Sequence, residues 1–440
     1  MIKPNHNRYL LEFILIGLLF LDLFIQVIPV MPITFAIIAW QFIRLDYNSN
    51  IILSLMILPF IVGSALNGVG ISGVGGYFLI LGVLLLVIGI ILKKTTFKIQ
   101  VKSILLMSFL LLFFFFSILT SSGGDYAGYK LFQTSKEGII FLIIFVVLFS
   151  NYDKIDAQRL GIFMLLYAFV LLRLSIIVNQ ISGPSNIVDF GFLRTQTASL
   201  WGYTREVFLI GYHQPGYLFL QGFAIYLMKG NSSLKRNILL LILGGLLTLF
   251  TGARQTIVIL FVFVITMILM KAKRKLTIPV LVGTVIILAT YLIETTSLGE
   301  LFGSTLAEGY IEGGSRGPWL MRGIELFLQN PVTGVGFGRY SLWGSYGTYP
   351  HNLFVEILCE LGIIGLLFIS ALTLSALKGT KHLWGRGIYF FLVIFLASMA
   401  SGGLESNIVV FSFLFALPSL RDYSFRYKRL KSRTDFGILQ

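Results

Sequence analysis

A polar island near the end of the chain, Thr295–Pro350, holds most of the side chains that could act on a charged substrate. It carries Arg316, Arg322 and Arg339 among glycines and aromatic residues, and His351 follows it directly. Arginine stays charged and binds phosphate oxygens bidentately, so a cluster of arginines suits a diphosphate. Histidine titrates near neutral pH and can take a proton from a hydroxyl group, or can bind phosphate as a cation. The island therefore indicates a site that acts on a diphosphate-bearing substrate.

The rest of the chain has the composition of a membrane protein. Apolar residues make up 56% of the 440 residues, charged residues only 12%, and the mean hydropathy is +0.88. A helix needs about 20 apolar residues to cross a bilayer, and such runs recur along the chain. We expect an all-α polytopic membrane protein with about 12–14 transmembrane helices. The fourteen apolar runs are Tyr9–Val27, Pro29–Ile43, Ile51–Leu66, Tyr77–Leu92, Val101–Thr120, Gln133–Ser150, Leu160–Gln180, Gly216–Met228, Ile238–Phe250, Gln255–Met270, Thr277–Glu294, Asn352–Leu377, Gly387–Ala400 and Glu405–Leu417.

The basic residues predict how the spans are oriented. With both termini in the cytoplasm, most of the 34 lysines and arginines fall in cytoplasmic loops, as the positive-inside rule requires. The net charge of +15 therefore reflects topology and attraction to anionic lipids, and nucleic acid is not an expected partner. We predict a single membrane domain over residues 1–440, a large extracytoplasmic loop at 295–351 and a basic cytoplasmic tail at 421–440.

Nine basic residues do not follow this rule. An arginine at membrane depth is costly unless it is paired, so each is a candidate functional residue. Arg173 lies inside the seventh span and could either snorkel to the interface or pair with Asp22. Lys130 and Lys136 are expected in the outside loop between the fifth and sixth spans. The remaining six are Arg194, Arg205, Arg254, Arg316, Arg322 and Arg339.

Four short blocks in and after the island carry a family resemblance. They are Ser315–Trp319, Asn330–Gly338, His351–Glu356 and Glu360–Gly365. In order and spacing they resemble the signature region of the O-antigen ligase/polymerase superfamily, which runs R…W, NPxxGxGxG, HNxxxE, ExGxxG. Two upstream segments also match: Thr251–Arg254 resembles the family's TG-S/A-R step, and His213–Gly216 resembles its HPN-like helix start.

The resemblance implies a GT-C-like glycosyltransferase in the bacterial cytoplasmic (inner) membrane. Such enzymes transfer a glycan from a polyprenyl diphosphate to an acceptor hydroxyl at the outer face, and need neither a nucleotide sugar nor a metal. No cofactor is expected. The expected partners are the polyprenyl-diphosphate-linked oligosaccharide donor, the glycan acceptor and membrane lipids. Proteins of a polysaccharide export or assembly system are candidate protein partners.

The resemblance also suggests catalytic roles. Departure of a diphosphate builds negative charge on the leaving oxygen, which positive groups stabilise. Arg254 and Arg316 match the family's two arginine positions and are the expected stabilising groups. His351 matches the family's histidine and is the expected general base for the acceptor hydroxyl, with phosphate binding as the alternative.

Further residues are expected to bind substrate. Arg339, Arg205 and His213 are candidates from the loops around the site. Glu356 could orient a partner or pair with an arginine. Asn352 could contact substrate or simply cap the helix that follows it.

Other polar-island features have simpler explanations. Asn330-Pro331 and the glycines around Gly336 are expected to shape a turn, although contact with substrate is the alternative. Arg322 is expected to face solvent or lipid head groups. The aromatic residues form either an interface belt or a surface that stacks on sugar rings: Trp319, Trp343, Tyr340, Tyr346 and Tyr349.

Three functions remain in competition. A repeat-unit polymerase of O-antigen, capsule or exopolysaccharide is the preferred one, and a ligase that passes a glycan to another acceptor is the alternative. A lipid-linked oligosaccharide flippase or another transporter is less favoured. Transporters are commonly built from repeats with charges at the midplane. This sequence has no internal repeat, and its unexplained charges lie towards one face.

Overall fold

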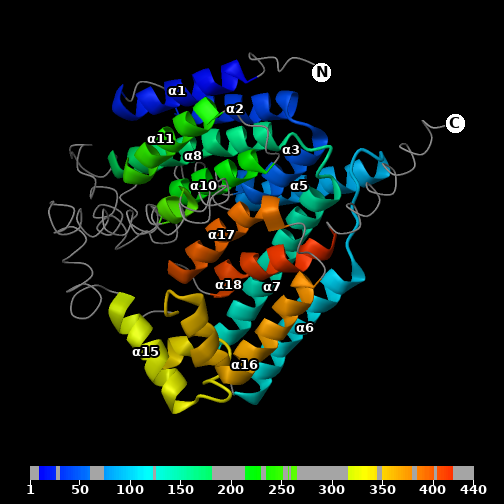
Figure 1. The fold of residues 1–440 in the computed structure, drawn as a ribbon, viewed down its shortest axis with the longest axis vertical. Helices are drawn as coiled ribbons and strands as arrows, with labels where there is room; N and C mark the ends of the chain where they lie inside the picture. Colours follow the sequence, from blue (N-terminus) through cyan, green and yellow to red (C-terminus); the bar gives the residue numbers. More distant parts are fainter. Residues whose placement is uncertain are drawn as a thin grey trace, which may run out of the picture.

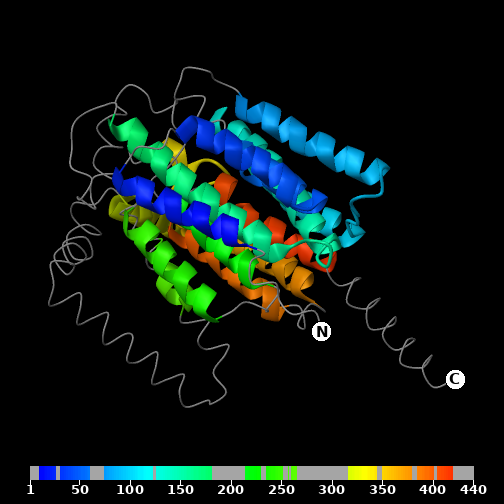
Figure 2. The ribbon, with the colours of Figure 1, turned by 90° about the horizontal axis from the view of Figure 1, so that it is seen from above.

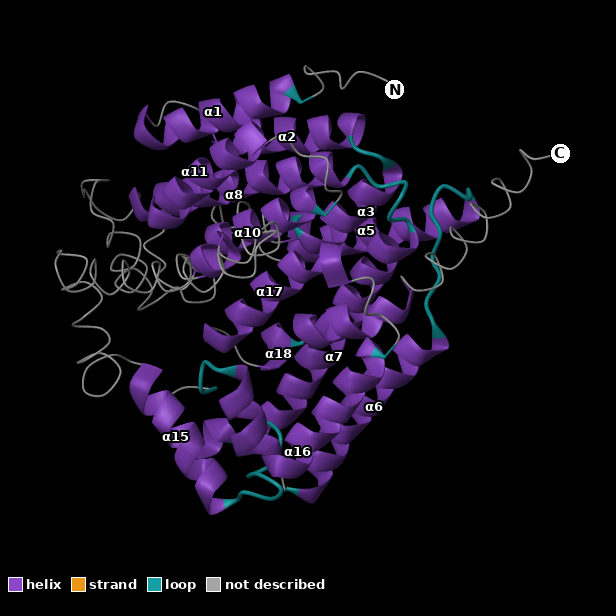
Figure 3. Cartoon of the chain, viewed as in Figure 1, coloured by secondary structure: helices purple, strands orange, loops and turns teal. Residues whose placement is uncertain are grey.

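The computed structural model describes residues 9–25, 30–59, 74–121, 125–180, 214–228, 234–250, 256, 259–264, 316–343, 349–378, 384–400 and 404–419. Within these ranges every regular element is helical and no strand occurs (Figures 1 and 3). The predicted all-α fold is therefore confirmed. The elements are α1 (Leu10–Ile25), α2 (Val30–Arg44), α3 (Tyr47–Met56), α5 (Val74–Ile91), α6 (Val101–Thr120), α7 (Asp125–Ser150), α8 (Ala157–Gln180), α10 (Gln214–Leu227), α11 (Leu234–Phe250), α15 (Arg316–Gln329), η2 (Tyr340–Trp343), α16 (Leu353–Leu377), α17 (Trp384–Ala400) and α18 (Leu404–Asn407).

Several of these helices have the length and composition of membrane spans. In the described part of the chain, Val101–Thr120, Tyr126–Ser150 and Leu353–Leu377 are each long and apolar enough to cross a bilayer. Figure 1 shows α6, α7 and α16 together in the lower part of the molecule, at an angle to α1, α2 and α8 in the upper part, and Figure 2 shows the molecule from above. Five shorter apolar helices accompany the three: Pro32–Arg44, Leu79–Ile91, Arg236–Leu247, Phe390–Met399 and Val409–Ser419.

Helix α6 shows why such a sequence suits a membrane. Its buried face carries Leu106, Leu110 and Phe114, spaced by one helical turn. The opposite face is apolar as well, since Phe109 and Leu112 are exposed. A helix that is apolar all round is stable only in a protein core or in lipid. The exposed side of α6 therefore fits the hydrocarbon of a bilayer.

Glycine allows the central helices α8 and α10 to pack closely. A Cβ atom at Gly161 would lie 2.5 Å from the backbone oxygen of Gly222, and one at Gly222 would lie 3.0 Å from the backbone oxygen of Gly161. Small residues at such crossings let two backbones approach, which favours helix association in membranes. Helix α8 also contacts α1, α2 and α3, so it forms the centre of the N-terminal part of the bundle.

Polar contacts join the start of α1, the α2–α3 connection and the α7–α8 connection at one end of the bundle. The Tyr9 hydroxyl donates to Asp156 (3.3 Å), and the backbone N–H of Asp156 donates to Asp46 (3.1 Å). The guanidinium of Arg159 donates to the carbonyl of Arg44 (3.1 Å). These loops meet at one end, as alternating spans require. That this end faces the cytoplasm stays a prediction.

The sixth span begins earlier than the sequence predicted. Helix α7 starts at Asp125 instead of Gln133. Lys130 and Lys136 therefore lie inside a helix, and their predicted place in an outside loop is wrong. In these first turns Ala127 and Lys130 are buried while Tyr129 and Phe132 are exposed, and a hydropathy pattern does not register a buried lysine.

The buried arginine of the seventh span is paired. Nε of Arg173 on α8 lies 2.8 Å from Oδ2 of Asp22 on α1, and both side chains are buried. Of the two alternatives for Arg173, pairing with Asp22 is confirmed. The ion pair joins α1 to the centre of the bundle.

Removing one partner of this pair should destabilise the protein. Arg173→Met takes away the charged partner of the buried Asp22 carboxylate, and breaking a buried ion pair in this way typically costs about 3–5 kcal/mol. We expect a clearly lower midpoint of thermal unfolding in detergent. The double variant Arg173→Met/Asp22→Leu should recover most of the loss, because it removes the buried negative charge as well. A single variant as stable as the wild type would contradict the assignment.

Candidate functional site

The candidate site is built around a break in helix α16. The residue at the break, Gly362, has φ +63° and ψ −165°, outside the helical region. The segment Asn330–Gly338, here called the glycine-rich loop, lies against this break. In Figure 1, α15 and the first part of α16 lie together at the lower end of the molecule.

Backbone hydrogen bonds lock the glycine-rich loop into the helix break. A broken helix frees N–H and C=O groups that must find other partners when they are buried. Two N–H groups of the loop donate to carbonyls before the break, and two N–H groups after it donate back to the loop. The four bonds are Val335 to Cys359 (2.8 Å), Gly336 to Glu360 (2.9 Å), Ile363 to Pro331 (2.9 Å) and Ile364 to Val332 (3.1 Å).

Two glycines make this close contact sterically feasible. A Cβ atom at Gly334 would lie 2.4 Å from the carbonyl carbon of Glu360, and one at Gly362 would lie 2.3 Å from the carbonyl oxygen of Val332. Both glycines also have positive φ, which other residues rarely adopt. The glycines thus shape the loop and the break, as the sequence predicted for the loop.

The other side of the loop packs on α6 and α7. The backbone N–H of Phe337 donates to Oγ of Ser117 (3.1 Å), and its ring stacks on Phe114 with centroids 4.6 Å apart. A Cβ atom at Gly338 would lie 2.7 Å from the Cα of Ala127. The loop is therefore enclosed between α16 on one side and the α6–α7 corner on the other.

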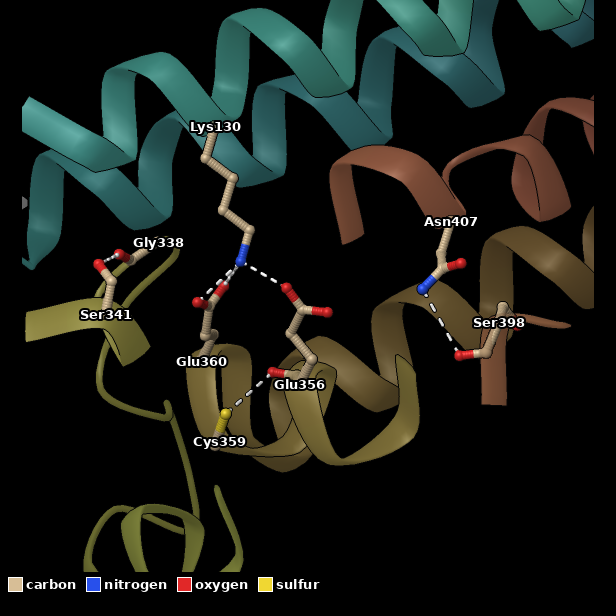
Figure 4. A network of polar contacts seen from close by, with 8 residues as sticks. All are labelled: Lys130, Gly338, Ser341, Glu356, Cys359, Glu360, Ser398 and Asn407. Atoms are coloured by element: carbon tan, nitrogen blue, oxygen red, sulfur yellow. Dashed lines mark hydrogen bonds and ion pairs between the residues drawn. The ribbon is translucent and has the colours of Figure 1, made fainter. Parts of the chain in front are cut away.

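A buried cluster of charges lies where these elements meet (Figure 4). Nζ of Lys130 donates to Oε1 of Glu356 (2.6 Å) and to both carboxylate oxygens of Glu360 (2.8 and 2.7 Å). The same ammonium lies 5.1 Å from the centre of the Phe337 ring. The side chains of Lys130 and Glu356 have no exposed area, and that of Glu360 has 1%. Charges buried this deeply are stable only when paired and hydrogen-bonded.

The cluster changes the interpretation of Glu356. The sequence offered pairing with an arginine, and the residue that pairs with Glu356 here is a lysine. The sequence marked Lys130 as a candidate functional residue and placed Glu360 in a family block, but it did not predict that the two residues contact each other or that Lys130 contacts Glu356. Residues four apart share one face of a helix, so the spacing of Glu356 and Glu360 was a signal for a basic partner opposite them.

Aromatic rings hold His351 from two sides. The imidazole stacks on Trp319 with ring centroids 4.5 Å apart and an angle of 16° between the planes. Tyr349 meets the imidazole edge-on at 4.5 Å. His351 itself has φ +58°, a conformation that is uncommon for a residue other than glycine. Strained backbone of this kind persists where the surroundings hold it, and it is frequent at functional sites.

Asn352 caps helix α16 immediately after this histidine. Its side-chain oxygen accepts from the N–H groups of Phe354 and Val355, at 3.0 and 3.1 Å. Its amide nitrogen donates to the carbonyl of Met399 on α17 (3.0 Å). The predicted helix-cap role is confirmed, whereas contact with substrate stays a prediction.

Trp319 is itself anchored to the same region. Its carbonyl oxygen accepts from the hydroxyl of Tyr340 (2.7 Å). Burial raises the pKa of Tyr340 well above its ordinary value, so this hydroxyl keeps its proton and its donor role at any working pH. A Cβ atom at Gly323 would lie 2.6 Å from Val355, which shows how closely α15 approaches α16. The stack on His351 is therefore held by both helices.

The geometry joins all four blocks that carried the resemblance. Residues 239–370 match the O-antigen ligase family. The match confirms the resemblance for the part of the chain that holds these four blocks and supports a glycosyltransferase-like membrane enzyme of the ligase/polymerase type. No curated protein matches the chain. Lys130 lies before the matched residues, so the O-antigen ligase region takes one member of its buried cluster from elsewhere in the chain.

Two arginines of the O-antigen ligase region are placed by the structure. Arg339 is half-buried at the end of the glycine-rich loop, with one guanidinium nitrogen 3.5 Å from the carbonyl of Val335. Its Nε is buried and has no hydrogen-bond partner among the described residues. Arg322 pairs with the exposed Glu325 at 2.9 Å, which agrees with the predicted surface position.

Other predicted site residues lie beyond what the structure describes. Arg254, Arg205 and His213 fall outside the described residues, and so does the tail at 421–440. Arg316 is the first residue of α15, and its side chain is also outside the description. Their roles remain predictions.

The helix break predicts that alanine substitution will destabilise the protein at Gly362 but not at Gly17. Gly362→Ala would force a positive φ on alanine and place its Cβ against Val332, so we expect a loss of about 2 kcal/mol or more. Gly17→Ala on α1 is the matched control, because no atom lies within 4 Å of its Cβ. That change should be neutral or stabilise by up to about 1 kcal/mol. Thermal unfolding in detergent measures both, and equal effects would contradict the packing of the loop.

Proposed function

We propose that the protein is a repeat-unit polymerase of a bacterial surface polysaccharide. It transfers a glycan from a polyprenyl-diphosphate donor to an acceptor sugar hydroxyl at the outer face of the cytoplasmic membrane, with both termini in the cytoplasm. The observation that carries the proposal is the O-antigen ligase match over 239–370, within which His351 is held between Trp319, Tyr349 and the cap of α16.

The proposed reaction exchanges one bond at the anomeric carbon for another. The bond from this carbon to the diphosphate oxygen breaks, and the diphosphate leaves with the electron pair. The acceptor oxygen forms the new glycosidic bond and loses its proton to His351. Arg254 and Arg316 stabilise the charge on the leaving diphosphate, a role that oriented positive groups perform well in a site shielded from water. Neither a metal nor a cofactor takes part in the proposed step.

The surroundings of His351 support its role as the base. A proton acceptor must lie within hydrogen-bond reach of the hydroxyl that it activates, and a small displacement can lower the rate about 100-fold. Stacking on Trp319 and the fixed start of α16 restrict both the ring and the backbone of His351. Arg339 lies twelve positions before His351 in the sequence, and its Nε is buried without a hydrogen-bond partner among the described residues. We propose that Arg339 binds phosphate or sugar oxygens.

A ligase is the second candidate, and the description of the matched family favours it. Both enzymes would break the same donor bond and differ only in the acceptor. The abundance of isoleucine and phenylalanine suggests a low-GC genome. A low-GC genome fits a bacterium whose envelope lacks lipid A. Such an envelope offers no lipid A core to a ligase, and this favours the polymerase.

Deletion of the encoding gene separates the two candidates. A polymerase mutant should carry single repeat units where the parent strain shows a ladder of surface glycan lengths. A ligase mutant should accumulate full-length glycan on the lipid carrier. Electrophoresis of surface glycan and analysis of extracted lipid-linked glycan measure the two outcomes. Normal glycan in the mutant would exclude both functions.

Single substitutions test the proposed roles. Arg254→Ala, Arg316→Ala and His351→Ala should each lower glycan transfer about 100- to 1000-fold, because each removes a group that acts in the transition state. Restoration of the glycan ladder in a deletion strain is the measurement, with protein level checked by immunoblot. Arg322→Ala is the matched control from the same region, since its exposed ion pair contributes little. Full activity of His351→Ala would exclude it as the base.

A further inference from the structure

The cluster around Lys130 connects parts of the site that are far apart in the sequence. Through one ammonium group, α7 contacts Phe337 of the glycine-rich loop, Glu356 of the HNxxxE block and Glu360 of the ExGxxG block. We propose that Lys130 is a positioning residue: it holds the loop and the first half of α16 in the arrangement that glycan transfer requires. The activity part of this inference rests on the proposed function.

The hydrogen bonds to α16 fix the orientation of that helix. Glu356 and Glu360 lie one turn apart on the same face, and Lys130 binds both. Contacts at two successive turns resist both rotation and sliding of the helix against α7. His351 and Asn352 precede this face directly, so the position of the histidine depends on how α16 is held.

The contact with the loop fixes the second part of the site. The ammonium lies over the ring of Phe337, an arrangement in which a cation is attracted to the face of an aromatic ring. Phe337 is also bound to α6 through Ser117, and Gly338 packs against Ala127, one turn before Lys130. Arg339 follows immediately, so the same corner places this arginine relative to α16.

The charges of the cluster determine which substitutions can test the positioning role of Lys130 without preventing the protein from folding. One ammonium and two carboxylates share a site without solvent, so removing the lysine would leave two buried carboxylates together. Lys130→Met is therefore expected to prevent accumulation of the protein. Two more conservative variants leave Glu356 unchanged and avoid a pair of buried carboxylates without a positive partner. Lys130→Arg preserves the positive charge but replaces a compact ammonium by a planar fork, and Glu360→Gln removes one negative charge.

We expect Lys130→Arg and Glu360→Gln to accumulate normally and to lower transfer about tenfold or more. Purified protein and lipid-linked glycan from the deletion strain should show a fall in kcat with little change in KM. Lys136→Arg is the matched control, because Lys136 lies on the same helix and is exposed. If both variants keep wild-type kcat, Lys130 only balances charge and the proposal is overturned.

The single cysteine provides a readout that does not depend on activity. Cys359 is fully buried between the two glutamates, and its carbonyl accepts from the glycine-rich loop. Loosening of the loop should expose the thiol, so labelling by a maleimide should be at least tenfold faster in both variants than in the wild type and in Lys136→Arg. Unchanged labelling would overturn the positioning role even if activity fell. The labelling experiment still tests the positioning of the loop if the deletion experiment excludes glycan transfer.

Discussion

A helix inside a membrane can be interrupted only where other groups take over the hydrogen bonds that the interruption frees. The break of α16 at Gly362 meets this requirement with the glycine-rich loop, which supplies two donors and two acceptors to the residues on either side. The loop in turn needs glycine at Gly334 to come close enough. The two blocks are therefore one structural unit, and neither can form its observed backbone without the other.

Electrostatics add a second requirement to this unit. Glu356 and Glu360 face the interior, and Lys130 approaches them from α7 with three hydrogen bonds. Such a cluster contributes less to net stability than its short distances suggest, because taking the charges out of water is expensive. The cluster has a greater effect on conformation than on stability. A movement that separates Lys130 from the two carboxylates would leave single charges in a low-dielectric interior, so only the arrangement that keeps them together is favourable.

The sequence predicted the class of fold better than the contacts within the candidate site. Continuous apolar runs were enough for the all-α membrane fold, and the HN pair was enough to predict a helix that begins after His351 with Asn352 as its cap. The start of α7 was missed because hydropathy marks where lipid contact begins, not where a helix begins. The contacts of Lys130 were missed because its partners are more than 200 positions away in the chain. For Arg173 the sequence named the correct partner but could not choose between pairing and snorkelling, because that choice depends on how α1 packs against α8.

The origin of Lys130 outside residues 239–370 has a consequence for engineering. A chimaera that exchanges only the matched region between two relatives would import Glu356 and Glu360 without the lysine and the α6–α7 corner that accompany them in this protein. The smallest portable unit is discontinuous: it comprises α6, the first turns of α7 and the segment from α15 to α16. Recombination at a single crossover between these parts would separate residues that contact one another in this structure.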